Sequence, residues 1–167
     1  MKASEALEKK KTKDFLEAAD RYCKFLESIP TNVDFFKEIH LTLTHLYLTA
    51  IKLPEISIDT NYEPDVSISL EQQKEIIDRL FGHLGDKRYY WHTFDPYDHI
   101  DNQPVCGDLA DDLLDIYKDL KRGLLKYDLP GIESKEHALW EMQFLFKNHW
   151  GAHCINAMRA VHEVVVR

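Results

Sequence analysis

The last stretch of the chain, residues 134–166, constrains the fold more than any other part of the sequence. It contains almost no helix-breaking residue, and its length predicts one helix of roughly 45 Å. Its apolar side chains point in nearly every direction on a helical wheel: Leu139, Trp140, Phe144, Leu145, Phe146, Trp150, Ile155, Met158, Val161 and Val164. Because a helix of this kind must be covered by other helices, we predict an all-α bundle around a long, largely buried C-terminal helix.

Four further helices are predicted from apolar side chains that recur at three- and four-residue steps. They span about residues 12–29, 33–53, 70–84 and 109–127. Ser69 and Gln72 form a capping-box pattern at the start of the third helix, and Asp108 is a favourable N-cap for the fourth. The prediction is therefore about five helices in one domain covering residues 1–167. Residues 1–12, which include three consecutive lysines, are expected to be a frayed N-terminal arm.

The composition is typical of a globular protein of the cytoplasm. The chain has 167 residues with 44% hydrophobic content, which suits one domain with its own core. It has no run of 18 apolar residues that could span a membrane, and residues 1–11 lack the apolar segment of a secretory signal. The three cysteines, Cys23, Cys106 and Cys154, are odd in number and show no CxxC spacing. This predicts reduced thiols and a cytoplasmic location.

The charge distribution restricts the kind of partner that the protein binds. The formal net charge of −8 argues against nucleic acid, because phosphate groups require a basic face. Nine aspartates lie between residues 95 and 128. Four of them are expected to form an acidic face opposite the apolar side of the fourth helix: Asp108, Asp111, Asp112 and Asp115. Such a face attracts basic partners or cations, or simply keeps a protein soluble.

Residues 85–107 are predicted to form a long, aromatic-rich loop. Loops of this length in a compact domain often carry a function, and Tyr and Trp are common anchors at protein interfaces. The candidate contact residues for an unidentified protein partner are Tyr90, Trp91, Phe94, Asp95 and Tyr97. The alternative is that Trp91 and Phe94 fill the end of the core while Asp95 and Pro96 turn the chain.

Two histidines of the C-terminal helix suggest a more specific site. His149 and His153 are four residues apart, so their side chains share one face with Asn156 close by. This is the spacing of helical metal ligands, and neutral imidazole is a common ligand for Zn, Ni, Fe or Cu. The alternative is that both are core histidines satisfied by hydrogen bonds. A metal site would need further ligands, for which the candidates are His92, Asp95, Asp108 and Asp112.

The helical wheel does not support these additional ligands. The aspartates of the fourth helix lie opposite its apolar side, so they are not expected to converge on His149 and His153. Residue 150 is Trp, which excludes an HExxH motif, and no nucleophile elbow or nucleotide-binding loop is present. We therefore expect no cofactor and favour a protein-interaction or scaffold module over an enzyme. A metal-binding protein with His149 and His153 as ligands is the alternative.

Several stretches of the sequence also resemble a known bacterial family. The first is GDLADDLLDIYKDLKRGL at residues 107–124, and the second is WEMQFLFKNHWGAH at residues 140–153, followed by Asn156-Ala157 and by RAVH at residues 159–162. Together with Tyr90-Trp91 and Phe94-Asp95-Pro96, they resemble the family called domain of unknown function 5063 across essentially the whole chain. The resemblance implies a small, mostly helical protein. It supplies no catalytic or ligand-binding residue that can be transferred.

Overall fold

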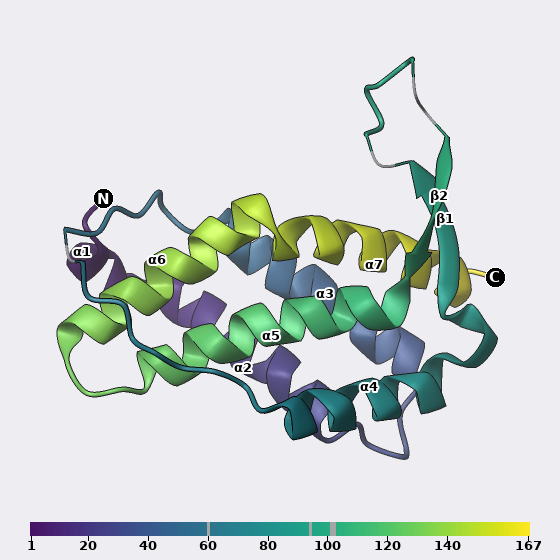
Figure 1. Cartoon of the computed structure of the whole chain (residues 1–167), viewed down its shortest axis with the longest axis horizontal. Helices are drawn as coiled ribbons and strands as arrows, with labels where there is room; N and C mark the ends of the chain where they lie inside the picture. The colour runs from purple at the N-terminus through teal and green to yellow at the C-terminus, as the bar shows by residue number, and fades with distance from the viewer. Residues whose placement is uncertain (60, 94, 101–102) are drawn as a thin grey trace.

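Helices make up most of the computed structural model, which describes residues 1–59, 61–93, 95–100 and 103–167. The described elements are α1 (Ala3–Leu7), α2 (Lys10–Glu27), α3 (Phe35–Ile51), α4 (Leu70–Leu84), the 3-10 turn η1 (Gly85–Lys87), β1 (Tyr89–Thr93), β2 (Pro104–Asp108), α5 (Leu109–Tyr127), α6 (Ile132–Asn148) and α7 (Trp150–Val165). The predicted helical bundle is confirmed, with a small β-hairpin projecting from one end (Figure 1). Within the described part of the chain, no helix is long and apolar enough to cross a membrane.

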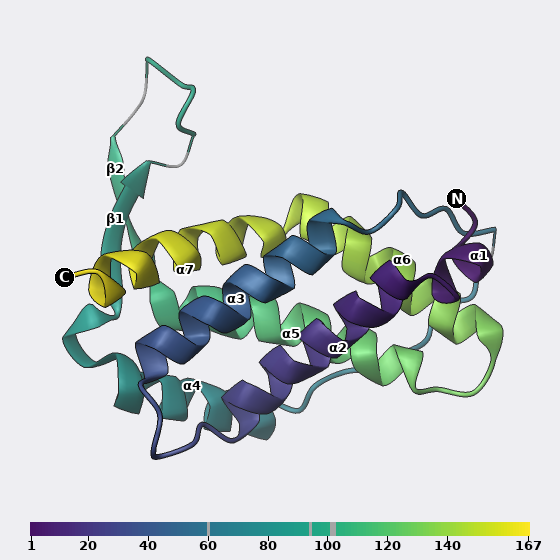
Figure 2. The same cartoon turned by 180° about the vertical axis from the view of Figure 1, so that it is seen from behind.

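Helix α5 packs against four other helices, α2, α4, α6 and α7. Its fully buried side chains Leu113, Ile116 and Leu120 recur at three- and four-residue steps, as a helix facing a core requires. Helices α6 and α7 lie end to end alongside α5, and α2 and α3 lie on the opposite side of the molecule (Figures 1 and 2). One side of α5 therefore faces α7 directly.

The prediction of one long C-terminal helix is wrong, because α6 and α7 are separated at His149. The backbone of His149 has φ −149° and ψ −87°, which is not helical. A Cβ atom at Gly151 would lie 2.1 Å from the carbonyl oxygen of Phe146, so this close approach between the two helices requires glycine. The indole of Trp150 is fully buried and donates a 3.0 Å hydrogen bond to the Met142 carbonyl.

The C-terminal segment packs against the other helices, as predicted, but its outer side is open. Helix α6 contacts α1 and α5, and α7 contacts α3 and α5. Leu139, Ala157 and Val161 are fully buried, whereas Phe144 and Ile155 are 48% and 45% exposed. The neighbouring helices therefore cover only part of the apolar surface of α6 and α7.

The prediction of a frayed N-terminal arm is also wrong. Residues 3–7 form helix α1, which packs against α6, and Ala3, Ala6 and Leu7 are buried there. The Thr12 hydroxyl donates a 2.6 Å hydrogen bond to the Ala6 carbonyl and ties α1 to α2. The small apolar residues of this segment allow α1 to pack closely on α6. The prediction gave more weight to the neighbouring lysine run than to these residues.

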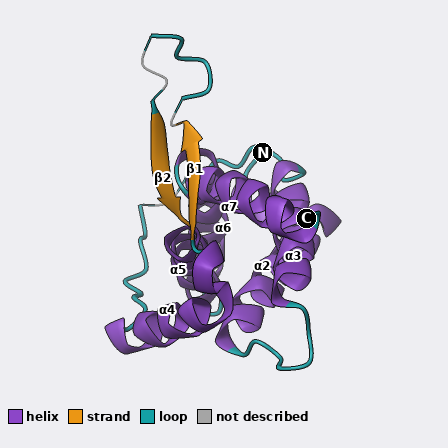
Figure 3. Ribbon diagram, turned by 90° about the vertical axis from the view of Figure 1, so that its right-hand side faces the viewer, coloured by secondary structure: helices purple, strands orange, loops and turns teal. Residues whose placement is uncertain are grey.

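The predicted loop at residues 85–107 contains an antiparallel hairpin. Tyr90 pairs with Gly107, and its ring lies so close that a Cβ atom at Gly107 would be 2.4 Å from it. The guanidinium of Arg88 donates to both carboxylate oxygens of Asp108, and the Leu109 N–H donates to the Arg88 carbonyl. A two-stranded hairpin is marginally stable alone. These contacts therefore hold its base while the strands project beyond the bundle (Figure 3).

Candidate metal centre

Three aspartates of α5 face α7, which contradicts the expectation that the acidic side of this helix points away from the histidines. Asp112 and Asp119 are buried, with 6% and 7% of their surface exposed, and Asp115 is half-buried. The helical wheel failed because α5 packs against four helices, so part of its polar stripe is covered as well as its apolar one. Within the predicted acidic face, Asp111 is exposed and Asp108 is half-buried at the hairpin base.

Each histidine of the predicted pair is held by one of these carboxylates. Nδ1 of His149 lies 2.6 Å from Oδ2 of Asp119, and Nδ1 of His153 lies 2.7 Å from Oδ1 of Asp112. An ionised carboxylate only accepts hydrogen bonds, so each Nδ1 donates and Nε2 is left free to act as a ligand. Such carboxylate–imidazole pairs orient the ligating histidines of metal sites. The two rings lie edge to face with their centroids 4.8 Å apart.

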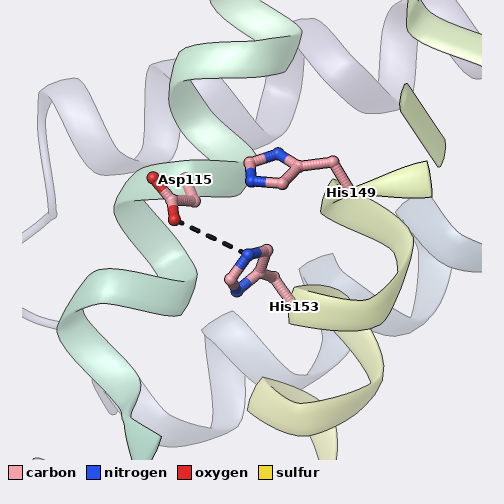
Figure 4. Close-up of side chains that lie close together, drawn as sticks. All are labelled: Asp115, His149 and His153. Carbon is pink, nitrogen blue, oxygen red and sulfur yellow. Dashed lines mark ion pairs between the residues drawn. The ribbon is translucent and has the colours of Figure 1, made fainter. Parts of the chain in front are cut away.

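Asp115 completes a cluster with the two histidines (Figure 4). Its Oδ2 lies 3.6 Å from Nε2 of His153, and one ligand atom from each of the three side chains lies within 4.8 Å of the others. Ligand atoms about 2.1 Å from one ion lie about 3–4 Å apart. Side-chain movements that shift these atoms by about 1 Å would therefore let all three bind one ion. Among the residues that the structure describes, no other group of three His, Cys, Asp or Glu side chains brings its ligand atoms this close together.

The cluster is accessible from one side. The His149, His153 and Asp115 side chains are 43%, 26% and 15% exposed. Partial exposure distinguishes this arrangement from a closed structural metal site, in which protein atoms fill every coordination position. An ion held by these three residues would keep positions for water or for another ligand.

The aspartates create a negative field around the cluster. The hydrogen bond to Asp112 raises the pKa of His153 above its ordinary value; burial opposes this shift, and the charges of Asp112, Asp115 and Asp111 add to it. Burial raises the pKa of Asp111, and the neighbouring Asp115 and Asp108 raise it further. The raised pKa of His153 shows that positive charge is favoured beside these aspartates.

Two cationic side chains of α5 balance part of this field. The Lys118 ammonium pairs with Oδ1 of Asp115, and the guanidinium of Arg122 lies 3.6 Å from Oδ1 of Asp119. Lys118 therefore contacts the same carboxylate that would bind the ion. An ion entering the cluster would compete with Lys118 for Asp115.

The predicted interaction residues of the hairpin fall into two groups. Tyr90 is half-buried against the bundle, and its hydroxyl donates a 2.5 Å hydrogen bond to Oδ2 of Asp112. Burial and this hydrogen bond raise the pKa of Tyr90 well above its ordinary value, so its hydroxyl stays protonated. Trp91 and Tyr97 are 68% and 84% exposed, which contradicts the alternative that Trp91 fills the core.

The remaining predicted residues do not join the cluster. Asp95 is exposed and accepts a 2.8 Å hydrogen bond from the Tyr97 N–H, and Phe94 lies outside the described residues. Asp108 pairs with Arg88. Asn156 is half-buried on α7.

The sequence reasoning missed Asp119 as a partner and placed Asp115 only on the acidic face. The available signal is a matched spacing: Asp115 and Asp119 are four residues apart, as are His149 and His153. When two helices pack side by side, such pairs can meet along the contact. Cys154, which lies next to His153 in the sequence, is buried, and burial raises its thiol pKa to about 12. Burial therefore disfavours the thiolate form that a nucleophilic cysteine needs.

Comparison with known proteins bears on the family and the fold. The fold is similar to the crystal structure of protein BF1032 from Bacteroides fragilis, with a TM-score of 0.81 and 25% sequence identity over 95% of this chain and 94% of that chain. A search of curated proteins gave no match. The family model of domain of unknown function 5063 matches residues 6–167, which confirms the resemblance seen in the sequence, and the chain belongs to this family.

Proposed function

We propose that this protein binds a divalent transition-metal ion through His149, His153 and Asp115. The observation that carries the proposal is that two carboxylate-held imidazoles converge with a third carboxylate on a solvent-accessible spot. Core histidines satisfied by one hydrogen bond need neither the additional carboxylate nor access to solvent.

The donor set favours first-row transition ions. Two imidazole nitrogens and one carboxylate oxygen suit ions such as Zn²⁺ or Fe²⁺, whereas Ca²⁺ and Mg²⁺ prefer sites made of oxygen ligands. Two nitrogen ligands and one oxygen ligand leave at least one coordination position open. The arrangement therefore supports Lewis-acid activation of a water molecule or a bound ligand.

Elemental analysis of protein purified without a tag tests this proposal. We expect about one transition-metal ion per chain, and we expect a chelator to remove it. Saturation at about 100 times Kd stabilises a fold by about 2.7 kcal/mol, which for a domain of this size shifts the melting temperature by about 5–10 °C. The variant His149→Ala should contain no stoichiometric metal and should not respond to the chelator. A metal-free wild-type protein that shows no response to added Zn²⁺ or Fe²⁺ would remove the proposal.

We propose as a second function that the hairpin docks a protein partner. The supporting observation is the exposure of Trp91 and Tyr97 on an element that projects from the bundle (Figure 3), since such residues often anchor interfaces. The hairpin connection also contains Asp95 and Asp98, so a basic partner surface is expected.

A double variant separates docking from a structural role. Trp91→Ser with Tyr97→Ser should keep the unfolding free energy within about 0.5 kcal/mol of wild type and should abolish cross-linking to the partner. Ile132→Ser is a matched control, because Ile132 is 50% exposed and is the first residue of α6, a helix that lies at the end of the bundle away from the hairpin (Figure 1). Unchanged cross-linking by the double variant would rule out hairpin docking.

A further inference from the structure

We infer that the surface pocket beside the metal centre binds an oxyanion, a phosphate or carboxylate group, that completes the coordination of the ion. The inference rests on the proposed metal-binding function. The pocket has a volume of about 330 Å³, and its walls include His149, Asp119, Lys118 and Arg122. Because His149 is both a proposed metal ligand and part of the wall, a molecule in this pocket lies next to the ion.

The charged side chains of the pocket favour an anion. Lys118 and Arg122 are one helical turn apart on α5, so both reach the same wall. The single carboxylate in the wall, Asp119, is already engaged by His149 and Arg122. The remaining positive charge, next to a divalent ion with open positions, suits a ligand with at least two anionic oxygens.

The guanidinium of Arg122 is not saturated by its present partners. It lies 3.6 Å from Asp119 and 3.5 Å from Glu141, which is longer than an ordinary charge-assisted hydrogen bond. Its Nε is buried and has no acceptor among the described residues. The side chain lines the pocket, and a guanidinium carries five N–H donors, so the terminal nitrogens of Arg122 have capacity for an oxyanion.

Lys118 links the two binding events. Its ammonium pairs with Oδ1 of Asp115. A divalent ion on Asp115 repels this ammonium, and the flexible Lys118 side chain, 36% exposed, is free to turn toward the pocket that it lines. Metal binding therefore raises the affinity of the pocket for an anion. By thermodynamic linkage, the anion raises the affinity for the metal to the same degree.

Titration of the Co²⁺-loaded protein with anions tests this inference. Visible absorption of the bound Co²⁺ is followed at pH 8 and constant ionic strength, with inorganic phosphate in one series and acetate in the other. We expect a saturable spectral change, with at least about 10-fold weaker binding in Lys118→Met and in Arg122→Met, which corresponds to losing one charge-assisted contact. The series that saturates at lower concentration identifies the phosphate or the carboxylate as the preferred group.

Lys121→Met is the matched control, since Lys121 pairs with Glu27 and is outside the pocket wall. It should keep the wild-type anion affinity. A Co²⁺ spectrum that neither anion changes would overturn the inference and leave the metal site intact. Equal anion affinity in the wild type, Lys118→Met and Arg122→Met would also overturn it. Failure of the wild-type protein to bind Co²⁺ would remove the proposed metal function together with this inference.

Discussion

The hydroxyl group of Tyr90 donates a 2.5 Å hydrogen bond to Oδ2 of Asp112. The other oxygen of this carboxylate accepts the hydrogen bond from Nδ1 of His153. One buried side chain therefore joins the base of the hairpin to the candidate metal centre. Changes at the hairpin base are expected to reach the histidines through Asp112.

Replacing Tyr90 with Phe tests this connection. The variant leaves Oδ2 of the buried Asp112 without its donor, and an unsatisfied buried acceptor costs about 1–3 kcal/mol of unfolding free energy. Urea unfolding measures the loss. Tyr89→Phe is the control, because Tyr89 is 60% exposed and should change the free energy by less than about 0.5 kcal/mol. Equal stability of the two variants would show that Tyr90 does not support Asp112.

The pair between Arg88 and Asp108 predicts a pH dependence of stability. Burial raises the pKa of Asp108, but hydrogen bonds from Arg88 and from the Ala110 N–H outweigh it, so the net shift is downward. A carboxyl with a lowered pKa in the folded state stabilises the protein above its unfolded pKa of about 3.9. That stability is lost as the pH falls through the folded value.

The variant Asp108→Asn isolates this contribution, because Asn is also a favourable N-cap. Its unfolding free energy should lie below that of the wild type at pH 7, and the difference should shrink as the pH falls below about 4. Urea unfolding at several pH values measures the difference. A difference that stays constant with pH would mean that the ionised Asp108 does not contribute.

Gly151 is expected to be essential for the break between α6 and α7. Gly151→Ala places a Cβ atom 2.1 Å from the Phe146 carbonyl oxygen, and such overpacking costs about 1–3 kcal/mol of stability. Gly82→Ala in α4 is the matched control, since a Cβ atom there meets nothing within 4 Å. It should stabilise the protein by about 0.5–1 kcal/mol, because Gly disfavours helices. Stabilisation by both substitutions would contradict the role of Gly151.

The carboxylates behind the histidines are expected to tune metal affinity. Asp119→Asn keeps the size of the side chain but removes the charge that orients His149, and loss of such a partner typically weakens metal binding by about 10–100-fold. Asp78→Asn is a control, because Asp78 pairs with Lys74 on an exposed part of α4. Competition with a chromogenic chelator measures both affinities. Unchanged affinity in Asp119→Asn would show that the carboxylate has no part in the site.

Local signals in the sequence predicted most of the helices. Ser69 accepts a hydrogen bond from the Gln72 N–H, and Asp108 accepts one from the Ala110 N–H, so both predicted N-caps are confirmed. The Gln72 side chain, which the capping-box pattern pairs with Ser69, donates to the Tyr117 hydroxyl. The two N-caps depend on residues close in sequence. The hairpin depends instead on contacts between Arg88 and Asp108 and between Tyr90 and Asp112, which join residues 20 and 22 positions apart.

The candidate site was predictable only in part, because it also depends on contacts between residues far apart in the sequence. The spacing of His149 and His153 pointed to a shared face, and the structure brings their rings together. The carboxylate partners were missed because a helical wheel describes one helix at a time. Asp112 and Asp119 become buried only when α7 packs on the side of α5 that is polar.

Calorimetric titration of the tag-free protein with Zn²⁺ at pH 8 tests the metal centre most directly. His40 and His162 form a second histidine pair, with ring centroids 5.5 Å apart, and provide a matched control. We expect one ion per chain to bind to the wild type and to the double variant His40→Ala with His162→Ala, and none to bind to His149→Ala with His153→Ala. Equal binding by the two double variants, or none by the wild type, would contradict this expectation.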